Sequence, residues 1–181
     1  TRLELGDVAQ AQAWLDAGLP PEFMGSRIGN GLMIGAWEGN IDLMRLFISR
    51  GADINRMNGN GETAIVLAAW RGQLEAVRWL LERGARLNAP PRHWSALHYA
   101  VFAGHREAVD YLLAQGADIN ARSTNGSSVL MMAIYEGRED LAREALVEKR
   151  RFVERGEALE KEHGAAQCVV DQYQDDIKKI E

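Results

Sequence analysis

The side chains that could perform catalysis are few and poorly spaced. The single cysteine, Cys168, lies five positions after His163, which is a poor spacing for a nucleophile and its base on one helical face. No histidine and cysteine spacing matches a zinc site. Carboxylates such as Glu75, Glu82 and Glu107 are scattered at positions expected to face solvent. The sequence therefore predicts a protein that is not an enzyme, with no catalytic residues, no metal site and no cofactor.

Aromatic side chains, in contrast, recur at one spacing that could support binding. Trp37, Trp70, Phe102 and Tyr135 each precede a glycine by two residues, and Arg71 lies beside the second of them. Aromatic residues give a large contact area at low entropic cost and dominate interface hot spots. Two interpretations stay open: the rings form a ladder that docks a peptide or protein, or they pack between neighbouring structural units.

The elements that position these residues repeat along the chain. One glycine series is separated by steps of 33, 33, 32 and 33 residues, and it consists of Gly6, Gly39, Gly72, Gly104 and Gly137. A second series follows each of the first four members by 12 residues, and it consists of Gly18, Gly51, Gly84 and Gly116. Two series with one period indicate a tandem repeat.

Between the glycines, the pattern predicts pairs of helices. Apolar residues recur at helical spacing, as in 74–81. Thr63, Ser95 and Ser128 are natural N-caps for the first helix of a pair, and Gly84 is placed where a left-handed glycine would end the second. Segments such as 57–61 are rich in turn residues. Each unit is predicted to be a turn, a helix, a glycine loop and a helix.

These motifs resemble ankyrin repeats, whose period is about 33 residues. The phrase Ser95-Ala96-Leu97-His98-Tyr99-Ala100 is similar to the T-P-L-H-x-A phrase of that family, and the resemblance covers roughly residues 3–147. Some of its phrases look like those of bacterial members. Alanine or another residue replaces the proline of the phrase in every repeat, which should weaken the helix starts. The resemblance implies an all-α solenoid of stacked helix-loop-helix units with short hairpin-like turns, in which His98 and His105 are structural.

The resemblance also implies where a partner binds. In this family the inner groove is made of first helices and hairpin tips, and the aromatic slot faces it. We therefore expect an unidentified protein or peptide to contact the aromatic slot and the tips, through Trp37, Trp70, Arg71, Phe102, Tyr135, Met57, Asn58, His93 and Trp94. Trp94 is either a packed wedge or an exposed anchor. The first tip, at 20–24, is the more apolar one.

The C-terminal segment breaks the repeat. The series predicts another glycine near 149, but residues 148–181 instead carry 16 charged residues in 34. We expect a repeat array over 1–150 and a charged helical extension over 151–181, with a helix from about 139, a turn near 163–165 and a final helix. The extension is expected to fold back as a helical cap, or else to form a coiled coil or bind a partner. Assembly through these helices is the alternative function.

The net charge and the length of the apolar runs further limit the classes of partner that we expect. The net charge of −5 disfavours nucleic acid, and no apolar run reaches the ~20 residues of a membrane helix. With one cysteine and no Met at position 1, we expect a cytoplasmic protein, or alternatively a periplasmic or secreted one after removal of an upstream signal. A monomer or small homo-oligomer is expected.

Overall fold

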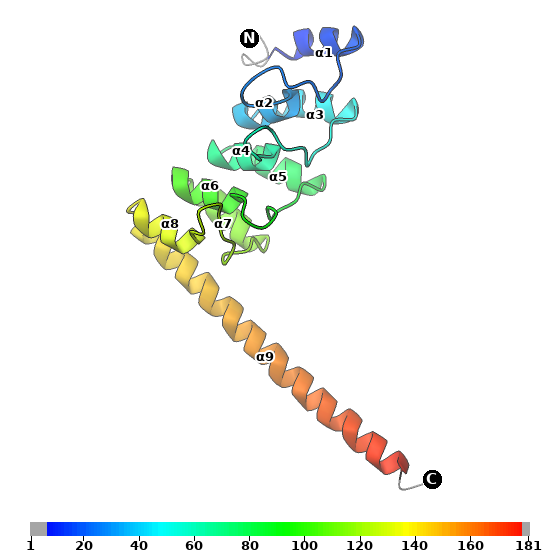
Figure 1. Ribbon diagram of the computed structural model, residues 1–181, viewed down its shortest axis with the longest axis vertical. Helices are drawn as coiled ribbons and strands as arrows, with labels where there is room; N and C mark the ends of the chain where they lie inside the picture. The colour runs from blue at the N-terminus through cyan, green and yellow to red at the C-terminus, as the bar shows by residue number, and fades with distance from the viewer. Residues whose placement is uncertain (1–6, 179–181) are drawn as a thin grey trace.

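The computed structural model describes residues 7–178, which form a stack of helices followed by one long helix (Figure 1). The helices are α1 (Val8–Asp16), α2 (Gly31–Glu38), α3 (Ile41–Ser49), α4 (Ala64–Trp70), α5 (Leu74–Glu82), α6 (Ala96–Ala103), α7 (Arg106–Ala114), α8 (Val129–Tyr135) and α9 (Glu139–Lys178). Within these residues the only β pairing is an isolated bridge between Arg122 and Ser128. The predicted all-α solenoid is confirmed.

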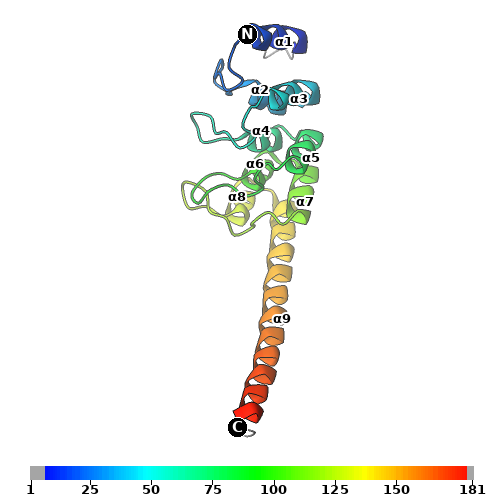
Figure 2. The ribbon, with the colours of Figure 1, turned by 90° about the vertical axis from the view of Figure 1, so that its right-hand side faces the viewer.

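The helices form two rows. Figure 2 shows α2, α4, α6 and α8 in an inner row, on the side where the long connecting loops project, and α3, α5, α7 and the start of α9 in an outer row. Each inner helix packs against its outer partner and against the inner helix of the next repeat. The core runs between the rows, and Leu32, Ile65 and Leu97 occupy the same place in successive inner helices. Burial of these side chains supplies most of the stabilisation.

Polar side chains set the starts of the inner helices. Ser95 accepts a hydrogen bond from the His98 N–H at 3.3 Å, and Ser128 accepts one from the Met131 N–H at 3.3 Å. At the start of α2, Asn30 Oδ1 accepts a hydrogen bond from the Met33 N–H. The caps predicted at Ser95 and Ser128 are confirmed, and Thr63 also stands at the N-cap position of α4, although its side chain makes no capping hydrogen bond. These caps satisfy N–H groups that have no partner inside the helix.

The second glycine series ends the outer helices as predicted. Gly51, Gly84 and Gly116 have φ values of 88°, 88° and 87°, which is the left-handed region that glycine adopts without strain. A side chain at Gly84 would meet nothing within 4 Å. The requirement for glycine at these positions is therefore one of backbone conformation alone.

In the first glycine series, Gly39, Gly72, Gly104 and Gly137 also have positive φ values, and the three central members are in addition covered by the following repeat. The pairs are Gly39 with Gln73, Gly72 with His105, and Gly104 with Arg138. At Gly72, a Cβ atom would lie 2.5 Å from Nδ1 of His105. The His105 Nε2 atom lies 2.9 Å from the Trp70 carbonyl oxygen, which fixes the ring over the glycine. These glycines therefore allow both the turn and the close contact with the following repeat. The structural role expected of His105 is confirmed.

The C-terminal segment differs from its predicted form. α9 is one unbroken 40-residue helix, whose first turns place Leu141 and Ala142 in the core beside α8, and which then runs away from the array (Figure 1). The turn predicted near 163–165, and with it the fold-back, was wrong. One glycine costs a helix about 1 kcal/mol, and the alanines after Gly164 favour helix. The predicted division at residue 150 falls inside α9 and stays a prediction.

Candidate functional site

Five aromatic side chains form a continuous chain of ring contacts, which we call the aromatic cluster. The ring centroids of Trp37 and Trp70 are 5.3 Å apart with the rings edge to face, and those of Trp70 and Tyr99 are 4.9 Å apart. Trp94 continues the chain, with centroids 4.9 Å from Tyr99 and 5.8 Å from Phe102. Contacts at such distances each contribute about 0.5–1.5 kcal/mol beyond burial. The cluster thus connects α2, α4 and α6 and reaches the loop before α6.

The cluster only partly follows the predicted ladder. Trp37 and Trp70 touch directly as expected, but Phe102 is joined to them through Trp94 and Tyr99. Sequence reasoning missed Tyr99. The available signal was its position three residues before Phe102, which places both rings near one helical face. Tyr135 ends α8, and its side chain lies outside the described residues.

Trp94 is a packed wedge with a hydrogen-bonded edge. It is half-buried, and its indole Nε1–H donates to Thr124 Oγ1 in the next loop at 3.2 Å. Its ring also lies 6.3 Å from that of His98. Trp94 therefore packs against the cluster at its loop side, and its contact with a partner stays a prediction.

The cluster is anchored to a buried polar network. The Tyr99 hydroxyl donates to Glu62 Oε1 at 2.8 Å, and Asn58 Nδ2 donates to Glu62 Oε2 at 2.8 Å. Burial raises the pKa of Tyr99, and the hydrogen bond and charge of Glu62 raise it further, so the phenol stays protonated and remains a donor. Asn58 is 8% exposed and its amide also donates to the Ile28 carbonyl. The prediction that Asn58 contacts a partner is therefore corrected, because its polar atoms hold two loops together.

Other predicted site residues remain accessible. Phe102 is 37% exposed, and Arg71 is exposed with its guanidinium 5.0 Å from the Trp37 ring centroid. Met57 and His93 are half-buried in successive loops. The edge of the cluster at Phe102 and Arg71 thus faces solvent, while Met57 and His93 lie beside it on the loops.

His98 is structural, as expected. The side chain is fully buried, and its Nδ1 lies 2.8 Å from Ser95 Oγ. Burial lowers its pKa, and the backbone of Ser127 and Ala121 in the next loop opposes that shift. The buried imidazole therefore completes the cap at the start of α6 with Ser95 and takes no part in an exposed site.

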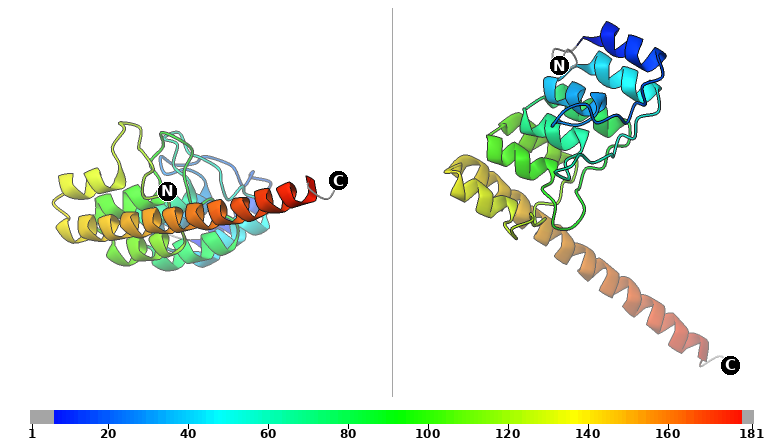
Figure 3. Two further views of the ribbon diagram at one scale, coloured as in Figure 1. Left: turned by 90° about the horizontal axis from the view of Figure 1, so that it is seen from below. Right: turned by 45° about the horizontal axis from the view of Figure 1, so that its top comes forward.

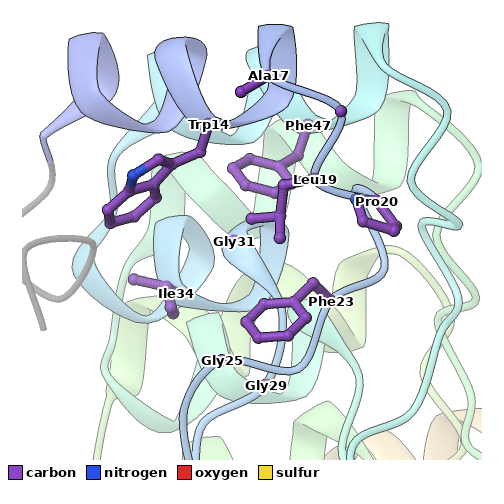
Figure 4. Close-up of a pocket in the computed structure, with 11 residues that line it drawn as sticks. Trp14, Ala17, Leu19, Pro20, Phe23, Gly25, Gly29, Gly31, Ile34 and Phe47 are labelled. Atoms are coloured by element: carbon purple, nitrogen blue, oxygen red, sulfur yellow. The ribbon is translucent and has the colours of Figure 1, made fainter.

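A separate apolar pocket opens at the N-terminal end of the array, with a volume of about 560 Å³. Figure 4 shows Trp14, Leu19, Phe23 and Phe47 around it, between α1, the loop after α1, and the start of α2. Among the residues that the structure describes, no charged side chain lines it. A Cβ atom at Gly31 would lie 2.0 Å from the Phe47 ring, so this glycine lets the ring pack against α2. The sequence indicated an apolar first loop but not a pocket.

Within residues 7–178, the structure gives no arrangement suited to metal chemistry or membrane insertion. No group of His, Cys, Asp and Glu side chains in this range could hold a metal ion. No helix among the same residues is long and apolar enough to cross a bilayer. What the described surface does offer is exposed aromatic, arginine and loop groups, which suit contact with another molecule.

Comparison with known families agrees with this architecture. The family model described as ankyrin repeats (3 copies) matches residues 32–123, from α2 to the loop after α7. The chain belongs to the ankyrin-repeat family. Ankyrin repeats generally mediate protein–protein interaction. No curated protein matches the chain. In this ankyrin-repeat protein, α8 and α9 follow the matched region and continue the helix pairs, since α9 begins 33 residues after the start of α7, Arg106.

Proposed function

We propose that this ankyrin-repeat protein binds a protein or peptide partner on its inner face, and that it is not an enzyme. The observation that carries the proposal is the aromatic cluster, which joins three repeats and ends at the exposed ring of Phe102. A rigid aromatic surface binds with little loss of side-chain entropy. The binding residues proposed are Phe102, Trp70, Trp37, Arg71, Tyr135 and the loop residues Met57, His93 and Trp94.

The cluster has a structural role as well as the proposed binding role. Trp37 and Trp70 are half-buried against each other, and Tyr99 is tied to Glu62. Removal of Trp70 should therefore lower stability as well as binding. Phe102 is the sharper probe, because its ring contacts Trp94 on one side and is otherwise the most accessible of the five.

The proposal is tested by Phe102→Ala. Short peptides are first selected from a random display library on the unmodified protein, and their affinity is then measured for the variant. We expect a loss of about tenfold or more, the size typical of an aromatic hot spot, with little change in the thermal midpoint. Leu159→Ala, which removes an exposed side chain on α9, is the matched control and should bind normally. Equal binding by both variants would contradict the proposal.

A second candidate function is assembly through α9. The helix leaves Leu146, Val153 and Leu159 between 46% and 59% exposed, and in proteins most of the stability of a helix comes from packing of its apolar face. We expect the mass in solution to rise with concentration and to return to that of a monomer in Leu159→Lys. Lys161→Gln, two residues along the helix, is the control. A protein that stays monomeric at all concentrations would exclude this candidate.

A further inference from the structure

Each of the loops before α2, α4, α6 and α8 carries at least one exposed arginine. We call Arg27, Arg56, Arg92 and Arg122, one from each loop, the arginine strip; the loop before α6 also holds the exposed Arg83 and Arg86. Arg92 adopts a positive φ of 64°, an uncommon conformation for a residue with a side chain. The loop segments 17–30, 50–63, 83–95 and 115–128 together hold seven arginines and four carboxylates, whereas the whole chain has a net charge of −5, so positive charge is concentrated at this edge.

The loops form one continuous edge. Figures 2 and 3 show them side by side along one side of the array, and contacts join them in turn. Asn58 Nδ2 donates to the Ile28 carbonyl at 2.9 Å, the His93 ring lies against Gly61, and Trp94 donates to Thr124. Because Trp94 belongs to the aromatic cluster, the arginine strip and the cluster are parts of one surface.

The carboxylates near the strip accept hydrogen bonds from other groups of the protein. Glu62 is buried and holds Asn58 and Tyr99. Glu22 accepts hydrogen bonds from Asn30 and from the Asp53 N–H, and its other contact is with Arg56 Nε at 3.8 Å. Asp53 and Asp118 accept from backbone N–H groups in their own loops.

The arginines make fewer hydrogen bonds and ion pairs within the protein than these carboxylates do. Arg122 donates only to the Gly126 carbonyl at 2.9 Å, which leaves its charge uncompensated. The exposed carboxylates Glu38 and Glu136 lie at the opposite ends of their helices from these loops. The loop edge therefore presents positive charge to a partner.

We propose that the partner segment is acidic and extended, with its carboxylates against the arginine strip and its apolar side chains against the aromatic cluster. This rests on the proposed function, because it specifies the chemistry of a partner for the same face. Guanidinium groups bind carboxylates through paired hydrogen bonds, and opposite charge favours encounter and orientation. A peptide fits better than nucleic acid, because its carboxylates can alternate with the apolar side chains that the cluster requires, whereas every nucleotide carries a phosphate charge and the protein has a net charge of −5.

The test compares peptides selected from one random display library on three proteins. The first is the unmodified protein, the second carries Arg27→Gln, Arg92→Gln and Arg122→Gln, and the third carries Arg45→Gln, Arg150→Gln and Lys161→Gln on exposed positions elsewhere. The second and third proteins have the same net charge. We expect acidic peptides with apolar residues from the first and third, and loss of the acidic bias from the second. An acidic peptide from the first selection should bind the second protein roughly tenfold more weakly, since exposed ion pairs each contribute a few-fold at low salt.

The outcomes separate this inference from the proposed function. Selected peptides without an acidic bias, whose binding still depends on Phe102, would overturn the acidic partner and leave inner-face binding intact. Acidic peptides that bind Phe102→Ala with the same affinity as the unmodified protein would show that the arginine strip and the aromatic cluster are not one binding surface. That result would also count against the proposed function. Tighter binding of a single-stranded oligonucleotide than of the acidic peptides would overturn the peptide as partner.

Discussion

Leu97→Ala is expected to lower the free energy of unfolding by about 3 kcal/mol, within the usual range for a buried leucine. Leu97 is 1% exposed and lies on α6, which packs against α4, α7 and α8. The substitution removes buried surface and leaves a cavity at the centre of the array. Because each repeat in a solenoid is stabilised by its neighbours, the loss affects the stack on both sides of α6. Denaturant unfolding followed by circular dichroism measures the change.

The matched control for this prediction is Ile134→Ala on α8. Ile134 has the same number of carbon atoms as leucine but is 63% exposed, so its removal should cost less than about 0.5 kcal/mol. Similar losses for the two variants would contradict the assignment of α6 to the core of the stack.

Gly72→Ala is expected to lower the free energy of unfolding by about 3 kcal/mol, for two separable reasons. An L residue at its φ of 70° is strained by roughly 1–2 kcal/mol. In addition, the new methyl group would lie 2.5 Å from the His105 ring and displace it from the Trp70 carbonyl. Loss of that hydrogen bond adds about 1 kcal/mol.

Gly84→Ala separates the two reasons. Gly84 has a φ of 88°, but nothing lies within 4 Å of an added Cβ atom, so only the backbone strain should appear. We expect Gly84→Ala to cost about 1–2 kcal/mol, less than Gly72→Ala in the same denaturant series. Equal costs would show that the contact between His105 and Gly72 contributes nothing to the coupling of the repeats.

The parts of the fold that could be predicted from sequence are those with local causes. Gly51, Gly84 and Gly116 end helices because of their own backbone conformation, and Ser95 and Ser128 cap helices through residues three positions away. A fixed period then places every unit once one unit is understood. The spacing of the glycines and of the capping serines was therefore enough to predict the paired helices that form the inner and outer rows.

The parts that could not be predicted depend on contacts between repeats. Tyr99 occupies the same place in its repeat as the buried Ile34 and Leu67, so its position predicted core packing rather than a link in the aromatic cluster. Asn58 is a typical turn residue, and its burial results from a neighbouring loop that supplies the Ile28 carbonyl. The contact of Asn58 has no signature within one repeat, and the link from Tyr99 to Trp70 has none beyond the spacing of Tyr99 from Phe102.

Gly164 does not end a helix, although glycines elsewhere in the chain do. Glycine ends the outer helices of the array, which made a turn near 163–165 a reasonable prediction. There, however, the segment after the glycine is held by the preceding repeat, as in the hydrogen bond from the Arg86 N–H to Asn55 Oδ1 at 2.8 Å, whereas Gly164 is followed by Ala165, Ala166 and Gln167. These residues have high helix propensity, and the helix continues through the glycine.

Hydrogen–deuterium exchange with and without a peptide selected on the unmodified protein locates the bound face without any substitution. We expect slower exchange in the loops around Arg92 and Arg122 and at the C-terminal ends of α4 and α6, with α5 and α7 unchanged. Protection confined to the outer helices, or to α9, would contradict a binding surface on the inner face.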